Sequence, residues 1–93
     1  MEKKIYLVIE DKTISRLAGN AYGRRLFDEQ VANMYSSNER FTIVFPENIQ
    51  DVAVSFIQGF FKILLDSMGR DKVLENIQIE ASPRVQRRIE GNL

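Results

Sequence analysis

The stretch FTIVFPENIQDVAVSFIQGFFKILLDSMG, residues 41–69, decides the fold expected for this chain. Its first five residues form a β-branched and aromatic run that predicts a buried strand. Pro46 lacks the backbone N–H that a strand ladder needs, so the strand is expected to end there. From Ser55 to Gly69 the apolar residues recur at helical spacing, with glycine as the stop. Five of the six phenylalanines lie in this stretch, so we expect it to form much of the core.

The start of this predicted helix is the strongest candidate for a functional site. Ser55 and Gln58 have the spacing of a capping box, in which the serine caps the helix and the glutamine reaches back to it. Asp51 lies in the preceding loop, at the carboxyl end of the strand, where ligands and partners dock in open α/β sheets. The loop 46–51 has no glycine and is therefore not a phosphate cradle. We expect Asp51, Ser55 and Gln58 to be available to a partner.

The segments before this stretch predict a second strand and a second helix. Residues 5–9 are continuously apolar, which is typical of a strand covered on both faces. Residues 15–37 have an apolar stripe at helical spacing, and Thr13 or Ser15 could cap that helix.

Two glycines, Gly19 and Gly23, lie one turn apart beside the apolar stripe. Each costs about 1 kcal/mol of helix propensity against alanine, so each is expected to have a use. The main interpretation is close packing of the helix backbone on a sheet. A surface approached by a ligand and a helix broken near Asn20 are the alternatives.

The segments after Gly69 predict a third strand and a last helix. In residues 73–80, polar and apolar side chains alternate, which indicates an edge strand with one buried face. Ser82 followed by Pro83 predicts the start of a helix, with the serine as its cap. Val85 and Ile89 then have the spacing of its buried side.

Arginines gather in two parts of the chain. We interpret them as solvated helix faces, with contact to an acidic partner or a phosphate as the alternative. The first group lies on the outer side of the helix predicted over 15–37 and consists of Arg16, Arg24 and Arg25. The second group lies on the last helix and consists of Arg84, Arg87 and Arg88.

The predicted order β-α-β-α-β-α makes residues 1–93 a single α/β domain with a mainly parallel sheet. Crossovers between parallel strands are right-handed, so strands in chain order would place the first two helices on the same face. The other face of the sheet would then lack cover. Either the strand order is shuffled, or a second copy or a partner covers that face.

Composition excludes several classes of function. The chain has no cysteine and no histidine, which removes disulfides, thiolate chemistry, zinc sites of the Cys/His type and the commonest general base. The carboxylates are scattered, so we expect no catalytic set, no metal and no cofactor. Thirteen basic and thirteen acidic residues leave no net charge, so we do not expect nucleic acid as a partner. No signal peptide or apolar run of about 20 residues is visible, so we expect a cytoplasmic protein with no membrane contact.

The sequence resembles a family of small bacterial and phage STAS-like domains of unassigned function, which are related to the anti-sigma-factor antagonists. The resemblance covers roughly residues 5–80 and depends on the order and spacing of four weakly specific motifs. These are Ser15-Arg16, Gly23-Arg24-Arg25-Leu26, the strand over 41–45, and Val54-Ser55-Phe56 at the start of the Phe-rich helix.

The resemblance implies a STAS-like sheet and a non-enzymatic module for regulatory protein–protein interaction. STAS domains dock on partners such as ATP-binding kinases of the anti-sigma type, and in the best-known members a serine or threonine at a helix start is phosphorylated to switch docking. Ser55 is the residue that matches this place, and helix capping is its structural alternative. Val44 departs from the family, because relatives often carry an acidic residue near this position. The alternative functions are a nucleotide- or phosphate-binding module and a structural, self-associating protein such as a homodimer.

Overall fold

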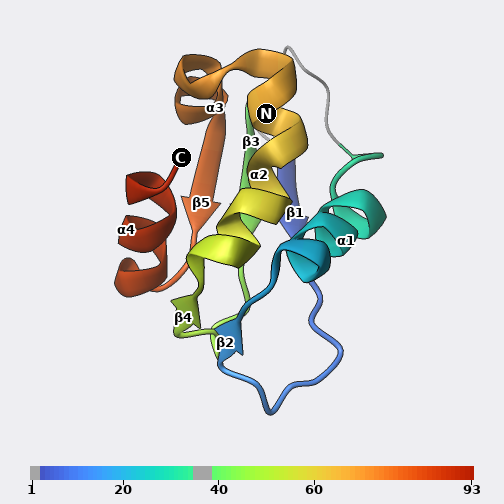
Figure 1. The fold of residues 1–93 in the computed structure, drawn as a ribbon, viewed down its shortest axis with the longest axis vertical. Helices are drawn as coiled ribbons and strands as arrows, with labels where there is room; N and C mark the ends of the chain where they lie inside the picture. The colour runs from blue at the N-terminus through green and yellow to red at the C-terminus, as the bar shows by residue number, and fades with distance from the viewer. Residues whose placement is uncertain (1–2, 35–38) are drawn as a thin grey trace.

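The structure is a computed structural model that describes residues 3–34 and 39–93. Its main sheet is parallel, in the order β1-β3-β5 (Figure 1). These strands are β1 (Lys3–Tyr6), β3 (Phe41–Val44) and β5 (Ile77–Glu80). A second parallel pair joins β2 (Arg16–Leu17) to β4 (Asp51–Val52). The helices of the described residues are α1 (Asn20–Gln30), α2 (Val54–Met68), α3 (Arg70–Asn76) and α4 (Pro83–Gly91). The predicted α/β class is confirmed, and β2, β4 and α3 extend the predicted order.

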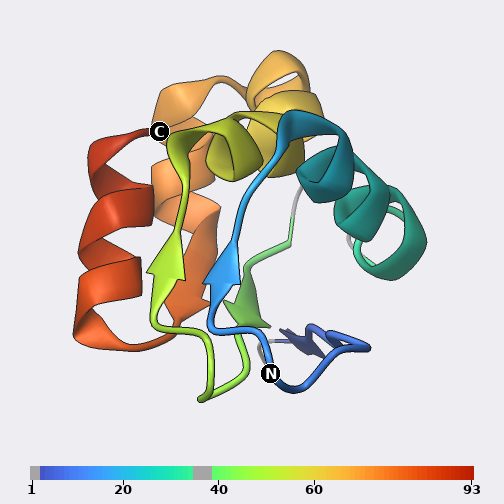
Figure 2. The same cartoon turned by 60° about the horizontal axis from the view of Figure 1, so that its bottom comes forward.

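One face of the main sheet carries the core and the other does not. Ile5 pairs with Ile43, and Ile43 with Ile79, so three buried side chains form one row across the sheet. In Figure 2 the helices lie above and beside the strands, and none of the helices of the described residues lies beneath β1 and β3. The prediction that residues 5–9 are covered on both faces is therefore wrong, since Tyr6 and Val8 are exposed. Strands in chain order with right-handed crossovers leave this face open.

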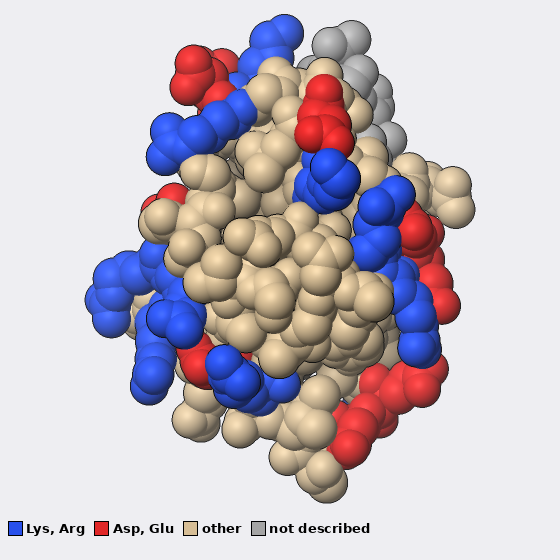
Figure 3. All heavy atoms as spheres, viewed as in Figure 1, with Lys and Arg blue, Asp and Glu red and all other residues tan. Residues whose placement is uncertain are grey.

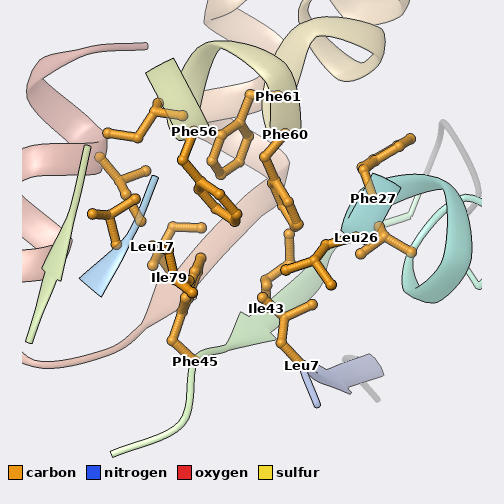
Figure 4. Packing of buried hydrophobic residues seen from close by; sticks show 14 of the residues in the cluster. Leu7, Leu17, Leu26, Phe27, Ile43, Phe45, Phe56, Phe60, Phe61 and Ile79 are labelled. Carbon is orange, nitrogen blue, oxygen red and sulfur yellow. The ribbon is translucent and has the colours of Figure 1, made fainter. Parts of the chain in front are cut away.

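The stretch over 41–69 supplies the centre of the core, as predicted. Phe60 is fully buried, and its ring has the ring of Phe61 at 4.9 Å and that of Phe27 at 5.8 Å in edge-on arrangements. The ring of Phe56 is stacked on it at 5.6 Å. Figure 4 shows these rings from α1 and α2 above the aliphatic side chains of the strands. Aromatic pairs in such geometries stabilise a core beyond the area that they bury.

Helices α1 and α2 touch backbone to backbone. A Cβ atom on Gly23 would lie 2.4 Å from the carbonyl oxygen of Phe56. A Cβ atom on Gly59 would lie 2.0 Å from the carbonyl oxygen of Asn20. Gly23 therefore allows close packing, as predicted, but the helix backbone packs against α2 and not against a sheet. Gly59 is its counterpart on α2, which sequence reasoning missed.

The small β2–β4 pair changes both helix starts. The predicted helix over 15–37 begins only at Asn20, after β2, and α1 ends at Gln30; the end predicted at residues 35–37 lies outside the described residues. Neither Thr13 nor Ser15 is a cap, because Gly19 occupies that position with a φ of 102°. The Thr13 hydroxyl instead donates to the Asp11 carboxylate. The two-residue strands form only by pairing across the fold, so no local pattern predicts them.

The C-terminal part follows the prediction at its ends and departs from it in the middle. Gly69 ends α2 with a φ of 84°, as expected for a glycine stop. The predicted strand over 73–80 is strand only at Ile77–Glu80, since α3 occupies its first half and buries Val73. β5 is an edge strand, as predicted. Ser82 caps α4 by accepting from the N–H of Val85, which confirms that prediction.

Candidate functional site

Ser55 lies exposed in the first turn of α2, but it does not cap this helix. The cap position is Ala53, whose extended backbone continues the β2–β4 pairing because its N–H donates to Leu17 at 2.7 Å. The predicted capping box of Ser55 and Gln58 is therefore wrong by two residues. The Ser55 hydroxyl oxygen instead accepts a hydrogen bond of 3.1 Å from the N–H of Gly19.

Two helix starts meet at Ser55. Gly19 is the N-cap of α1 and Ala53 that of α2, and neither helix has a side-chain cap. The first backbone N–H groups of a helix have no partner within the helix, and the helix dipole adds positive potential there. Gln58 is exposed one turn after Ser55. Val54, the residue before Ser55, is exposed as well. We call Gly19, Val54, Ser55 and Gln58 the helix mouth.

Asp51 does not belong to the helix mouth. It lies in β4 with 21 % of its side chain exposed, and its Oδ2 atom accepts from the Arg16 Nε atom at 3.1 Å. The Arg88 Nε atom lies 3.6 Å from Asp51 Oδ1 and donates to the carbonyl of Val52 at 2.9 Å. Asp51 thus ties β2, β4 and α4 together, so the prediction that it is available to a partner is not supported.

The charges around Asp51 keep it ionised. The hydrogen bond from Arg16 lowers the pKa of the Asp51 carboxyl below its ordinary value of 3.8. Partial burial opposes this shift, while the Val52 N–H and the charges of Arg88 and Arg84 add to it. Asp51 Oδ1 is itself buried and has no hydrogen-bond donor among the described residues. We call Arg16, Arg84 and Arg88 with Asp51 the arginine cluster.

The six predicted arginines separate into two places. Arg16 belongs to β2 and the arginine cluster, so the prediction that it shares a helix face with Arg24 and Arg25 is wrong. Arg24 and Arg25 lie on α1, where exposed ion pairs join them to Asp28 at 3.9 Å and Glu29 at 3.5 Å. Such solvated pairs contribute little to stability.

The α4 side of the molecule is the more basic one. Arg84, Arg87 and Arg88 are exposed there, with Arg16 beside them. Figure 3 shows this gathering of basic side chains at the side where Figure 1 draws α4, with acidic atoms among them. The described part of the chain shows no ion pair of Arg84 or Arg87 within 4.0 Å. Positive charge therefore exceeds negative charge on this surface.

The described residues contain no group of three or more acidic side chains placed to hold a metal ion. None of their helices is long and apolar enough to cross a membrane.

The role of the Gly19 N–H was missed by sequence reasoning. Gly19 lay inside the helix predicted over 15–37, and the alternative of a break near Asn20 was its only signal, because the partner, Ser55, is 36 residues away. Comparisons of the chain with protein-family models, curated proteins and solved structures find no match.

Proposed function

We propose that this protein is a non-enzymatic regulatory interaction module of the STAS-like kind, which binds a protein partner through the helix mouth. The observation that carries the proposal is the position of Ser55. Its hydroxyl is exposed and is held by the backbone of another helix, at a place where two helix starts converge. A partner docking here would meet four residues without charge, beside the first backbone N–H groups of two helices.

We further propose that phosphorylation of Ser55 controls this docking. A phosphoryl group adds a charge of about −1.5 to −2 and three strong acceptor oxygens. At Ser55 it would lie near the N-terminal ends of α1 and α2, where N–H groups and helix dipoles stabilise an anion. The resemblance to STAS domains suggests an ATP-binding kinase of the anti-sigma type as the partner. Val44 in place of the acidic residue of many relatives is the feature that argues against a complete switch.

The test compares Ser55→Glu with Ser67→Glu, which places the same charge on the exposed C-terminal end of α2. Tagged wild-type protein and both variants are expressed in the native cell, and the proteins that copurify are quantified by mass spectrometry. We expect one partner to be lost or gained with Ser55→Glu and retained with Ser67→Glu, while thermal melts show both variants folded. The same partners with all three proteins would refute the helix mouth as the docking site.

A second candidate function is the binding of a nucleotide or another phosphate ligand at the arginine cluster. The observation in its favour is that Arg16 and Arg88 direct their Nε atoms inward, to Asp51 and to the carbonyl of Val52. Guanidinium groups anchored in this way are suited to bidentate contact with phosphate. Asp51 already neutralises part of their charge, which ranks this function second. Thermal shifts with nucleotides that are lost in Arg88→Gln and kept in Arg24→Gln would favour it.

A further inference from the structure

The face of the main sheet opposite the helices is unusual for its exposed apolar residues. Its side chains are those that alternate with the core residues along each strand, and we call it the open face. Tyr6 is 65 % exposed and Val8 62 %, and they are the most exposed large apolar side chains among the described residues. The open face consists of Lys4, Tyr6 and Val8 from β1 and its continuation, Thr42 and Val44 from β3, and Gln78 and Glu80 from β5.

The register arranges this face in two rows. Lys4, Thr42 and Gln78 form one row, and Tyr6, Val44 and Glu80 form the next. The Lys4 Nζ atom lies 3.1 Å from Glu80 Oε2, so an ion pair crosses the face diagonally from one edge strand to the other. Thr42 lies on β3, between these two strands, and is only 4 % exposed. The positive group therefore lies on β1 and the negative group on β5.

Two hollows flank the carboxyl end of β3. The first, of about 220 Å³, lies on the β1 side and includes Tyr6, Val8 and Pro46 in its lining. The second, of about 340 Å³, lies on the β5 side and is lined by Val44, Glu80 and Ala81 among others. Tyr6 is level with Val44 and Glu80 in the register, so the exposed ring lies level with residues of the second hollow.

We propose that the open face is a dimer interface, on which a second copy of this chain packs about a twofold axis parallel to β3. This operation places β1 of one copy over β5 of the other. Lys4 then meets Glu80 of the second copy, and the reverse contact forms at the same time. The ring of Tyr6 lies over the hollow beside Val44 and Glu80 of the second copy. Each feature meets its complement, as an isologous interface requires.

A second copy of the chain fits the open face better than an unrelated partner does. The charges on the open face are opposite at its two edges, so the face is complementary to itself under the twofold operation. The chain carries thirteen basic and thirteen acidic residues, so two copies do not repel one another over long distances. Sheets that pack face to face keep their strands within about 30° of one another, which this axis allows. The level difference between Lys4 and Glu80 is two residues, or about 6.6 Å, which a lysine side chain spans.

The dimer is expected to be weak and independent of the proposed partner site. The open face has only three strands about 4.8 Å apart, so the area that it can bury is smaller than the roughly 800 Å² per partner of a standard interface. We therefore expect a dissociation constant in the micromolar range, about 10–100 μM. α2 packs on the opposite side of the main sheet, so dimerisation leaves the helix mouth accessible.

The first test is the mass in solution. Sedimentation equilibrium from about 5 μM to about 1 mM should show a shift from 10.8 kDa to twice this mass. Tyr6→Ser should raise the dissociation constant more than about tenfold, because it removes the ring that fills the hollow. Met34→Ser is the matched control, since Met34 is 46 % exposed in the turn after α1 and is not one of the open-face residues. A wild-type chain that stays monomeric at about 1 mM would overturn the proposal.

The second test separates the contact between copies from the ion pair within one copy. Lys4→Glu and Glu80→Lys should each be monomeric at about 100 μM, because like charges then meet across the interface. An equimolar mixture of these two variants should form a heterodimer, since the carboxylate introduced in one variant faces the ammonium group introduced in the other. The intramolecular pair is broken in both variants, so recovery on mixing can come only from contacts between copies. Variants that dimerise alone, or a mixture that stays monomeric, would overturn the proposed packing.

Discussion

The backbone contact between α1 and α2 predicts a large loss of stability for Gly59→Ala. The added Cβ atom would lie 2.0 Å from the carbonyl oxygen of Asn20 and 2.8 Å from its carbonyl carbon. Both atoms belong to the backbone of the first turn of α1, so no side-chain rotation can relieve the clash. A normal contact requires α1 and α2 to separate by at least about 1 Å, and overpacking of this kind costs about 3 kcal/mol.

Part of this cost is offset by the better helix propensity of alanine. Alanine in place of glycine favours the helix by about 1 kcal/mol, which leaves a net loss of about 2 kcal/mol. For a chain of this size, 1 kcal/mol changes the melting temperature by about 4–8 °C. Gly59→Ala should therefore melt about 8–16 °C below the wild type, with most of the helix content retained until unfolding begins.

The assay is thermal and urea unfolding followed by circular dichroism, with Gly91→Ala as the control. Gly91 is the last residue of α4, and a Cβ atom there would meet nothing within 4 Å. This control should be as stable as the wild type or slightly more stable. If Gly59→Ala matched Gly91→Ala, the backbone contact between α1 and α2 would not exist as described.

Three further changes test the arginine cluster, the start of α4 and the helix mouth. Asp51→Asn should lower the melting temperature at neutral pH, because Arg16 and Arg88 lose their anion. Folding lowers the pKa of Asp51, so its ionised form is stabilised above the ordinary value of 3.8, and this stabilisation is lost as the pH falls through the folded pKa. The gap between wild type and Asp51→Asn should therefore close below pH 3.8, and a gap constant from pH 7 to pH 3 would contradict the ion pairs. Ser82→Ala should cost about 1 kcal/mol of unfolding free energy in urea titrations, since it removes the cap of α4. Ser55→Ala should cost about 0.5–1.5 kcal/mol and speed amide hydrogen exchange at Gly19, whereas unchanged exchange would mean that the hydroxyl does not hold this N–H.

Features that depend on neighbouring residues were predicted at the candidate site, and features that depend on distant residues were not. The apolar run before Pro46, the glycine at Gly69 and the Ser82-Pro83 start were each recognisable from neighbouring residues, and each is confirmed. Ser55 was singled out for its place at the start of α2, which is also confirmed. Its assigned role as a cap was wrong, because that role depends on where β4 ends and not on the residues that follow Ser55.

The sequence alone therefore determined β3, the edge position of β5, the apolar character of α2, the cap of α4 and the exclusion of histidine and cysteine chemistry. These features depend on residue type and on periods of two or 3.6 residues, which operate within one element. The sequence did not determine the bounds of β1, which was predicted over residues 5–9 and is found at Lys3–Tyr6. Only the tertiary structure decided that Arg16 meets Asp51 and that Gly19 donates to Ser55, since these partners are 35 and 36 residues apart. It also decided that Tyr6 and Val8 face outward, because the strand order, and not the strand's own composition, determines which face the helices cover.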